Sequence, residues 1–194
     1  MGRFGSAGAA LLALTLAFPI TGHAADERNR GETPGGVQPS PLPSAETQDE
    51  DFVKTASALL LPEIDASRIG VEKARNSEVK ALSQRMVDSY SELAGKLQQA
   101  ARSAGLGMAD KADPHGENRI QRLQEAGPQF DITYLGEQHS WHKKLIAIYS
   151  MEQRAGQNEA LKKHAEEGRA LLMRNLEEIQ RLQAALVEER KTPG

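Results

Sequence analysis

The chain has 194 residues, no cysteine and a formal charge of −3, and these facts exclude several classes of protein. Without cysteine there is no disulfide, no thiol nucleophile, no cysteine-ligated metal and no lipid attached through a cysteine. A nucleic-acid-binding protein would carry a basic surplus, whereas here 24 Lys and Arg stand against 27 Asp and Glu. The two signs alternate along the chain, as on a solvated helix surface.

The first 24 residues have the pattern of a secretory signal peptide. Arg3 precedes an apolar run over residues 9–20, and the small residues Gly22 and Ala24 lie three positions and one position before a cleavage site after Ala24. The run is shorter than the ~20 residues of a membrane span, and no later segment approaches that length. We therefore expect a periplasmic or secreted protein with no lipid anchor and no transmembrane segment after cleavage.

Residues 25–48 read as a disordered tether. Gly, Pro and Ser dominate them, and such a composition buries too little apolar surface to fold. The pattern of the remaining chain, residues 49–191, is helical and predicts one domain.

The first helical stretch is expected over residues 49–74. It places Glu63 in the middle of an otherwise apolar face, and Pro62 should interrupt and kink the helix just before Glu63. The second stretch begins after the capping residue Asn76, carries Tyr90 on its apolar face and stops near Gly105.

A long connection, residues 105–128, follows. Asp113 and Pro114 form a cap with proline at the first helical position, which predicts a short helix over 114–126. A third stretch starts at Gln129, and a tight turn at residues 156–158 leads into a fourth that frays near Lys191.

The connections predict the architecture. No run of alternating β-branched and aromatic residues is present, so the fold is expected to be all-α. The first and third connections are short, while the second is long enough to return along a ~38 Å helix. This order is typical of a ferritin-like four-helix bundle with a crossover, here containing the short helix, rather than of a simple up-and-down bundle.

Each long stretch offers one polar residue at the centre of its apolar face: Glu63, Tyr90, His142 and Asn175. Their distances from the short turns place them at similar heights, so they are expected to converge. One interpretation is a buried polar network in which Glu63 accepts hydrogen bonds from Tyr90 and His142, while Asn175 completes His142.

The other interpretation is a metal site for zinc or iron, with Glu63, His142, His139 and Tyr90 as ligands. Tyrosine and an amide oxygen are weak replacements for imidazole, and the Glu-x-x-His motif of di-iron bundles does not occur. We therefore favour the network, with no cofactor. His164, level with Tyr149, is interpreted as a hydrogen-bonding residue at the edge of the core.

Several segments, in this order and spacing, carry a family resemblance: residues 78–88, the pairs Phe130-Asp131 and Tyr134-Leu135, and His142 followed by Leu145. Through them the chain resembles the bacterial envelope family called domain of unknown function 4142, which is grouped with ferritin-like folds. The resemblance implies one inward Glu and three inward His in typical members. This chain keeps only Glu63 and His142, since Tyr90 and Asn175 stand where histidines are usual.

The function expected from these observations is that of a non-enzymatic envelope module that acts through its stability or through protein contacts, with a role in stress tolerance implied by the resemblance alone. The alternative is a mononuclear metal-binding or redox protein of the ferritin-like class. The chain shows no nucleophile elbow and no phosphate-binding loop. Neither an envelope protein partner nor the oligomeric state is specified by the residues.

Overall fold

A computed structural model describes residues 45–191, and everything described there is helical or connecting. The predicted signal peptide and most of the predicted tether lie outside these residues. The elements in chain order are α1 (Ala45–Lys73), α2 (Ser77–Ser103), α3 (Pro114–Glu125), the 3-10 turn η1 (Gly127–Gln129), α4 (Phe130–Ala155) and α5 (Glu159–Lys191). Over residues 45–191 the prediction of an all-α fold is confirmed.

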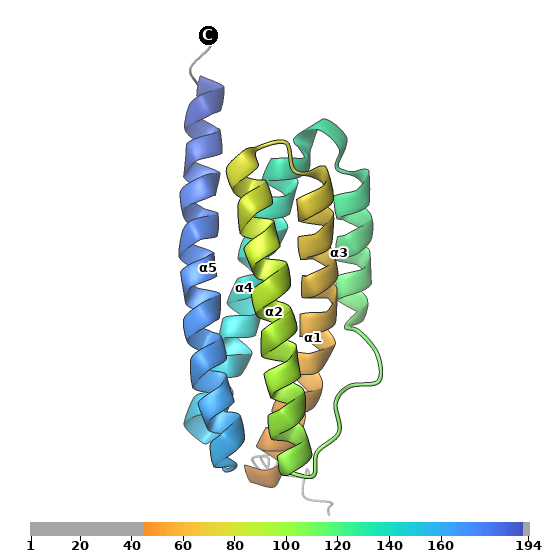
Figure 1. Ribbon diagram of the computed structural model, residues 1–194, viewed down its shortest axis with the longest axis vertical. Helices are drawn as coiled ribbons and strands as arrows, with labels where there is room; N and C mark the ends of the chain where they lie inside the picture. Colours follow the sequence, from red (N-terminus) through yellow and green to blue (C-terminus); the bar gives the residue numbers. More distant parts are fainter. Residues whose placement is uncertain (1–44, 192–194) are drawn as a thin grey trace, which may run out of the picture. The chain divides into compact units, whose positions relative to one another are not determined.

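The four long helices form a bundle in which each packs on two others (Figure 1). Helix α1 packs on α2 and α4, and α5 completes the bundle by packing on the same two helices. The chain runs along α1, returns along α2, crosses back through α3, and descends and ascends again in α4 and α5. The short, long, short order of connections is therefore present, and the crossover helix α3 lies against α1 outside the four.

The helix ends follow from local side-chain chemistry. Asn76 accepts hydrogen bonds from the backbone N–H groups of Glu78 and Val79 at 2.9 and 3.2 Å, which satisfies two of the free donors at the start of α2. Asp113 accepts from the N–H of His115 in the same way at the start of α3. Both predicted caps are confirmed.

Helix α1 differs from the prediction in two respects. It begins at Ala45, so residues 45–48, which the sequence assigned to the tether, are helical. The reason is that the buried carboxylate of Asp49 binds the turn between α4 and α5, which anchors the first turn of α1. In addition, Pro62 lies inside a continuous helix and does not interrupt it.

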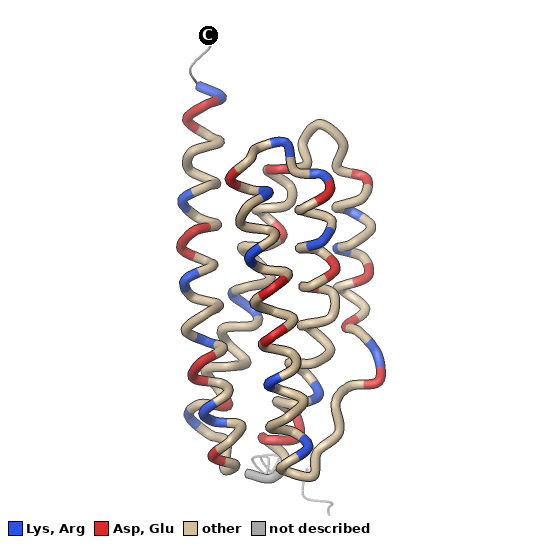
Figure 2. Tube along the Cα trace, in the orientation of Figure 1, with Lys and Arg blue, Asp and Glu red and all other residues tan. Residues whose placement is uncertain are grey.

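The interior is filled by the apolar faces of the long helices. Leu172 and Ile179 of α5, which flank Asn175 in the sequence pattern, are completely buried, while Glu177 on the other side of that helix is exposed. Acidic and basic residues interleave along the helices (Figure 2), as the alternating charges predict. Within residues 45–191 no helix combines the length and apolar character needed to cross a membrane.

Candidate functional site

The four predicted central residues come one from each long helix. Glu63, Tyr90 and His142 are fully buried, and Asn175 is partly buried at the outer edge. A polar group in such a position needs a partner, because leaving it unpaired costs about 1–3 kcal/mol. The structure gives these residues partners, although not the ones that the sequence suggested.

Three of the four residues form a directed chain of hydrogen bonds. The Nδ1 atom of His142 lies 2.7 Å from the backbone oxygen of Gln138, which can only accept, so Nδ1 carries the proton. The Nε2 atom of His142 is then an acceptor, and the hydroxyl of Tyr90 donates to it at 2.5 Å. The side-chain amide of Asn175 donates in turn to the oxygen of Tyr90 at 2.7 Å. Tyr90 thus donates to His142 and not to Glu63.

Glu63 pairs instead with Arg119, a residue of the crossover helix that sequence reasoning missed. Arg119 is 1% exposed, and its Nη1 donates to Glu63 Oε2 at 2.9 Å. Its Nη2 donates to Gln138 Oε1 at 2.6 Å, and its guanidinium lies 4.9 Å from the ring centre of Trp141. A cation therefore already occupies the carboxylate that a metal would use.

Pro62 explains how the crossover reaches the centre of the bundle. Proline has no backbone N–H, so it cannot bond the carbonyl of Ala58 one turn earlier in α1. That carbonyl accepts instead from the backbone N–H of Asp113, at the start of α3, at 2.9 Å. Gly116 lies directly on the Pro62 ring, because a Cβ at residue 116 would approach it to 2.5 Å. This close approach allows Arg119, one turn later, to enter the core.

Burial sets the charge state of these groups. It lowers the pKa of His142 to about 3, and the nearby positive charge of Arg119 acts in the same direction. It also raises the pKa of Glu63 to about 7, although Arg119 opposes that shift. His142 is therefore a neutral imidazole at any physiological pH, which agrees with its role as an acceptor for Tyr90.

Four buried polar atoms around Arg119 have no partner within the described residues: Glu63 Oε1, Arg119 Nε, Tyr134 Oη and Gln138 Nε2. Two of the four are N–H groups, which can donate hydrogen bonds but cannot ligate a cation. Only Glu63 Oε1 is an anionic ligand, and it shares its carboxylate with the guanidinium. This donor set fits a metal cation poorly.

The other predicted ligand, His139, lies one turn before His142 on α4 and is partly buried. Among residues 45–191 no group of three His, Asp or Glu side chains is placed to hold a metal. The structure thus joins Tyr90, His142 and Asn175, and it directs Glu63 to Arg119. His164 is buried, and its Nε2 lies 3.5 Å from the hydroxyl of Tyr149, a long hydrogen bond at the edge of the core.

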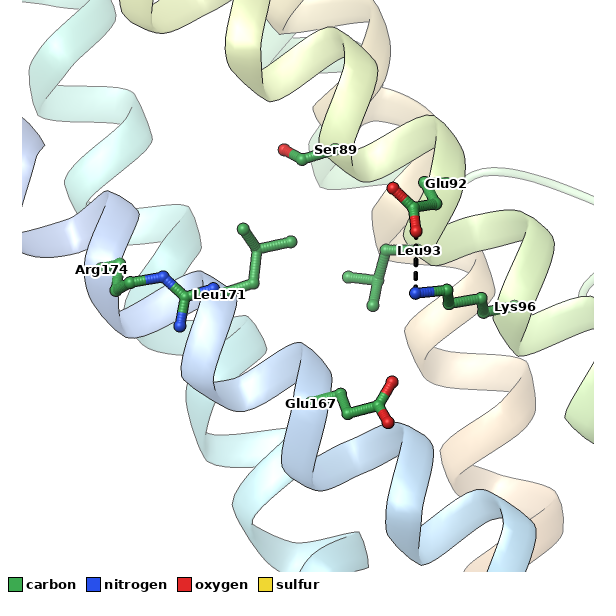
Figure 3. A pocket seen from close by; sticks show the side chains of 7 residues that line it. All are labelled: Ser89, Glu92, Leu93, Lys96, Glu167, Leu171 and Arg174. Atoms are coloured by element: carbon green, nitrogen blue, oxygen red, sulfur yellow. Dashed lines mark ion pairs between the residues drawn. The ribbon is translucent and has the colours of Figure 1, made fainter.

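A hollow between α2 and α5 is lined by residues other than the four central ones (Figure 3). Leu93 and Leu171 face it together with charged side chains of both signs, and Glu92 pairs with Lys96 at 2.8 Å. A surface of mixed sign with an apolar part does not select an ion of either charge. The hollow therefore adds no ligand to the central residues.

The polar centre can fix the register of the helices, but its geometry offers little for catalysis. The imidazole of His142 is neutral, its acceptor nitrogen is occupied, and the side chain is sealed from solvent. A general base needs access to a substrate proton. Sequence reasoning missed Arg119 because one arginine among polar residues looks exposed. The spacing of Gly116, Arg119 and Leu123, which share one face of α3, was the available signal.

Comparison with known proteins agrees with the family suggested by the sequence. A search of curated proteins and a search of solved structures each found no match. The model of one family, the domain of unknown function DUF4142, matches residues 36–182, which include most of the bundle. That match covers far more than half of the chain, so the protein belongs to the DUF4142 family.

Proposed function

We propose that the chain is an exported, ferritin-like but non-enzymatic module of the cell envelope, whose central polar residues serve the packing of the bundle. The observation that carries the proposal is the pairing within the chain: Arg119 binds Glu63, and Tyr90 binds the one nitrogen of His142 that could accept. Such a network can specify a unique packing of helices at some cost in stability. The module then acts through its surface, by contacts with other envelope proteins, and its role in stress tolerance is inferred from the family resemblance.

Metal analysis tests the non-enzymatic part of the proposal. The natural protein and the variant His142→Ala are purified and titrated with zinc and with ferrous iron in a calorimeter. We expect weak or no binding by both proteins. Stoichiometric binding by the natural protein that is lost in His142→Ala would overturn the proposal in favour of a metal-binding or redox protein.

That second candidate, a mononuclear site with Glu63, His142, His139 and Tyr90, has one supporting observation. Glu63 Oε1 is buried without a partner and would accept a cation. A metal at Glu63 Oε1 would, however, share that carboxylate with the buried guanidinium of Arg119, and to reach His142 Nε2 it must break the hydrogen bond from Tyr90. The network interpretation therefore ranks first.

Export is tested separately. The pattern around Gly22 and Ala24 predicts that the envelope form of the protein begins at Ala25. N-terminal sequencing of the envelope fraction reads this directly, and a chain that still begins at Met1 in that fraction would contradict export by signal cleavage.

A further inference from the structure

The end of the bundle at which α1 begins holds a second set of buried acidic groups, away from the central residues. The carboxylate of Asp49, in the first turns of α1, accepts the backbone N–H groups of Gln157 and Asn158 at 2.8 and 2.9 Å. These two donors belong to the turn between α4 and α5. Asp49 therefore fastens the beginning of α1 to that turn.

Glu152, near the end of α4, lies under the same turn. Its side chain is completely buried, and its Oε2 accepts from the side-chain amide of Gln48 at 3.1 Å. Its Oε1 has no hydrogen-bond partner within the described residues. A Cβ at Gly156 would lie 2.4 Å from this oxygen, so only glycine allows the carboxyl group to fold beneath the turn. The glycine of the turn is thus required for the buried position of the Glu152 carboxyl group.

The charges that face Glu152 come from two other helices. Asp49 of α1 is a second acidic group beside it, and Lys162 of α5 is the cation that acts on it. Gln48 is neutral and donates a hydrogen bond. Burial raises the pKa of Glu152 to about 7, and Asp49 adds to the rise, whereas Gln48 and Lys162 oppose it. In this environment the acid exchanges its proton near neutral pH.

We propose that Asp49 and Glu152 form a pH-sensitive latch, which holds the beginning of α1 on the α4–α5 turn while Glu152 is protonated and loosens when Glu152 ionises. Protonated Glu152 places no charge against Asp49, which then keeps both backbone donors. Ionised Glu152 sets a second negative charge beside Asp49, and the cation that acts on Glu152 among the described residues, Lys162, is itself paired with Glu159 at 3.0 Å. Opening the first turn of α1 admits water to both carboxylates and relieves this repulsion.

The direction of the effect follows from proton linkage. The closed latch binds the proton of Glu152 more tightly than the open one, in which the pKa of Glu152 returns toward its ordinary value of 4.5. The stabilisation of the closed latch is therefore complete below that ordinary value and is lost as the pH rises through about 7. Because one proton is involved, the equilibrium changes by at most ~tenfold per pH unit.

Amide hydrogen exchange, followed by nuclear magnetic resonance, tests the latch in the full chain. The probes are the N–H groups of Gln157 and Asn158, and their protection factors are corrected for the intrinsic exchange rate at each pH. Between pH 5.5 and 8.5 we expect the protection of both amides to fall by up to ~30-fold in the natural protein. The variant Glu152→Gln keeps the size and neutral state of the protonated acid, so its protection should not change with pH.

The control is Glu50→Gln, which removes an exposed carboxylate from the same turn of α1 and should leave the pH dependence as it is in the natural protein. Constant protection in the natural protein, or an unchanged pH dependence in Glu152→Gln, would overturn the latch. If Glu152→Gln does not fold, the side-chain carboxyl carbon of Glu152 is titrated in the natural protein. A midpoint near 4.5 would then refute the proposal, and one near 7 that coincides with the loss of protection would support it.

Discussion

The pair formed by Glu63 and Arg119 predicts an unusual dependence of stability on pH when the arginine is replaced. In the natural protein the pKa of Glu63 is raised to about 7, above its ordinary value of 4.5. The contribution of Glu63 to the free energy of unfolding is therefore complete below pH 4.5 and is lost as the pH rises through about 7. Above that pH the carboxylate is ionised in both the folded and the unfolded state, and the curve levels off.

The variant Arg119→Met removes the only cation that contacts Glu63 among the described residues. The pKa of Glu63 must then rise further, because burial is no longer opposed by a positive charge. Near pH 5 Glu63 is neutral in the folded state of both proteins, so the variant loses only the packing and hydrogen bonds of Arg119. Above pH 7 its stability keeps falling by about 1.4 kcal/mol per pH unit, while that of the natural protein does not.

The difference between the two proteins should therefore widen by about 3 kcal/mol from pH 7 to 9, within the 3–5 kcal/mol expected for breaking a buried ion pair. Urea denaturation followed by circular dichroism at each pH measures it. The matched control is Arg122→Met, on the same helix, whose exposed pair with Glu137 should contribute less than ~1 kcal/mol at every pH. A difference between natural protein and Arg119→Met that stays constant from pH 5 to 9 would refute the role assigned to Arg119.

Two further predictions address the buried apolar face of α5 and the convergence of the central residues. Because Leu172 is completely buried, Leu172→Ala should lower the free energy of unfolding by ~2–5 kcal/mol by opening a cavity. The control Glu177→Ala, at an exposed position of the same helix, should lower it by less than ~0.5 kcal/mol. Equal midpoints of urea denaturation for the two variants would contradict the assigned face. The double variant Tyr90→His, Asn175→His adds two imidazoles to the one of His142 and removes the hydroxyl that binds His142. Together with Glu63 these imidazoles form a ligand set that suits zinc, so the zinc affinity of the variant should exceed that of the natural protein by at least ~tenfold. Calorimetric titration of both proteins measures this gain, and no gain would mean that the four positions do not converge closely enough to share a metal.

Local chemistry made the helices predictable from the sequence. The caps at Asn76 and Asp113 act over two or three residues, so they can be read without knowledge of the fold. The burial of Glu63, Tyr90 and His142 could be predicted as well, because helical periodicity also depends only on residues a few positions apart. The beginning of α1 was misplaced because its anchor, the contact of Asp49 with the α4–α5 turn, joins residues more than 100 positions apart.

The partners of the central residues were beyond the reach of periodicity. Which hydroxyl donates to which nitrogen depends on shifts of a few tenths of an ångström in the positions of the helices. The spacing of apolar residues along a helix fixes only the side that each residue faces. Arg119 was missed because its burial depends on Pro62 freeing a carbonyl in α1 and on Gly116 allowing α3 to approach. Each of these residues has an ordinary local interpretation, and only their contact across two helices brings the arginine inside.

The hydrogen bonding of His142 is the most direct test of the central claim, that the acceptor nitrogen of this residue is held by Tyr90 and not by a metal. Nitrogen-15 resonance of the imidazole, recorded from pH 8 to 4.5 with and without one equivalent of zinc, reports which nitrogen carries the proton. We predict a neutral ring with the proton on Nδ1 throughout, since its pKa is lowered to about 3, and no change on addition of zinc. A ring that gains a proton near pH 6.5, or an Nε2 resonance that shifts when zinc is added, would contradict the account.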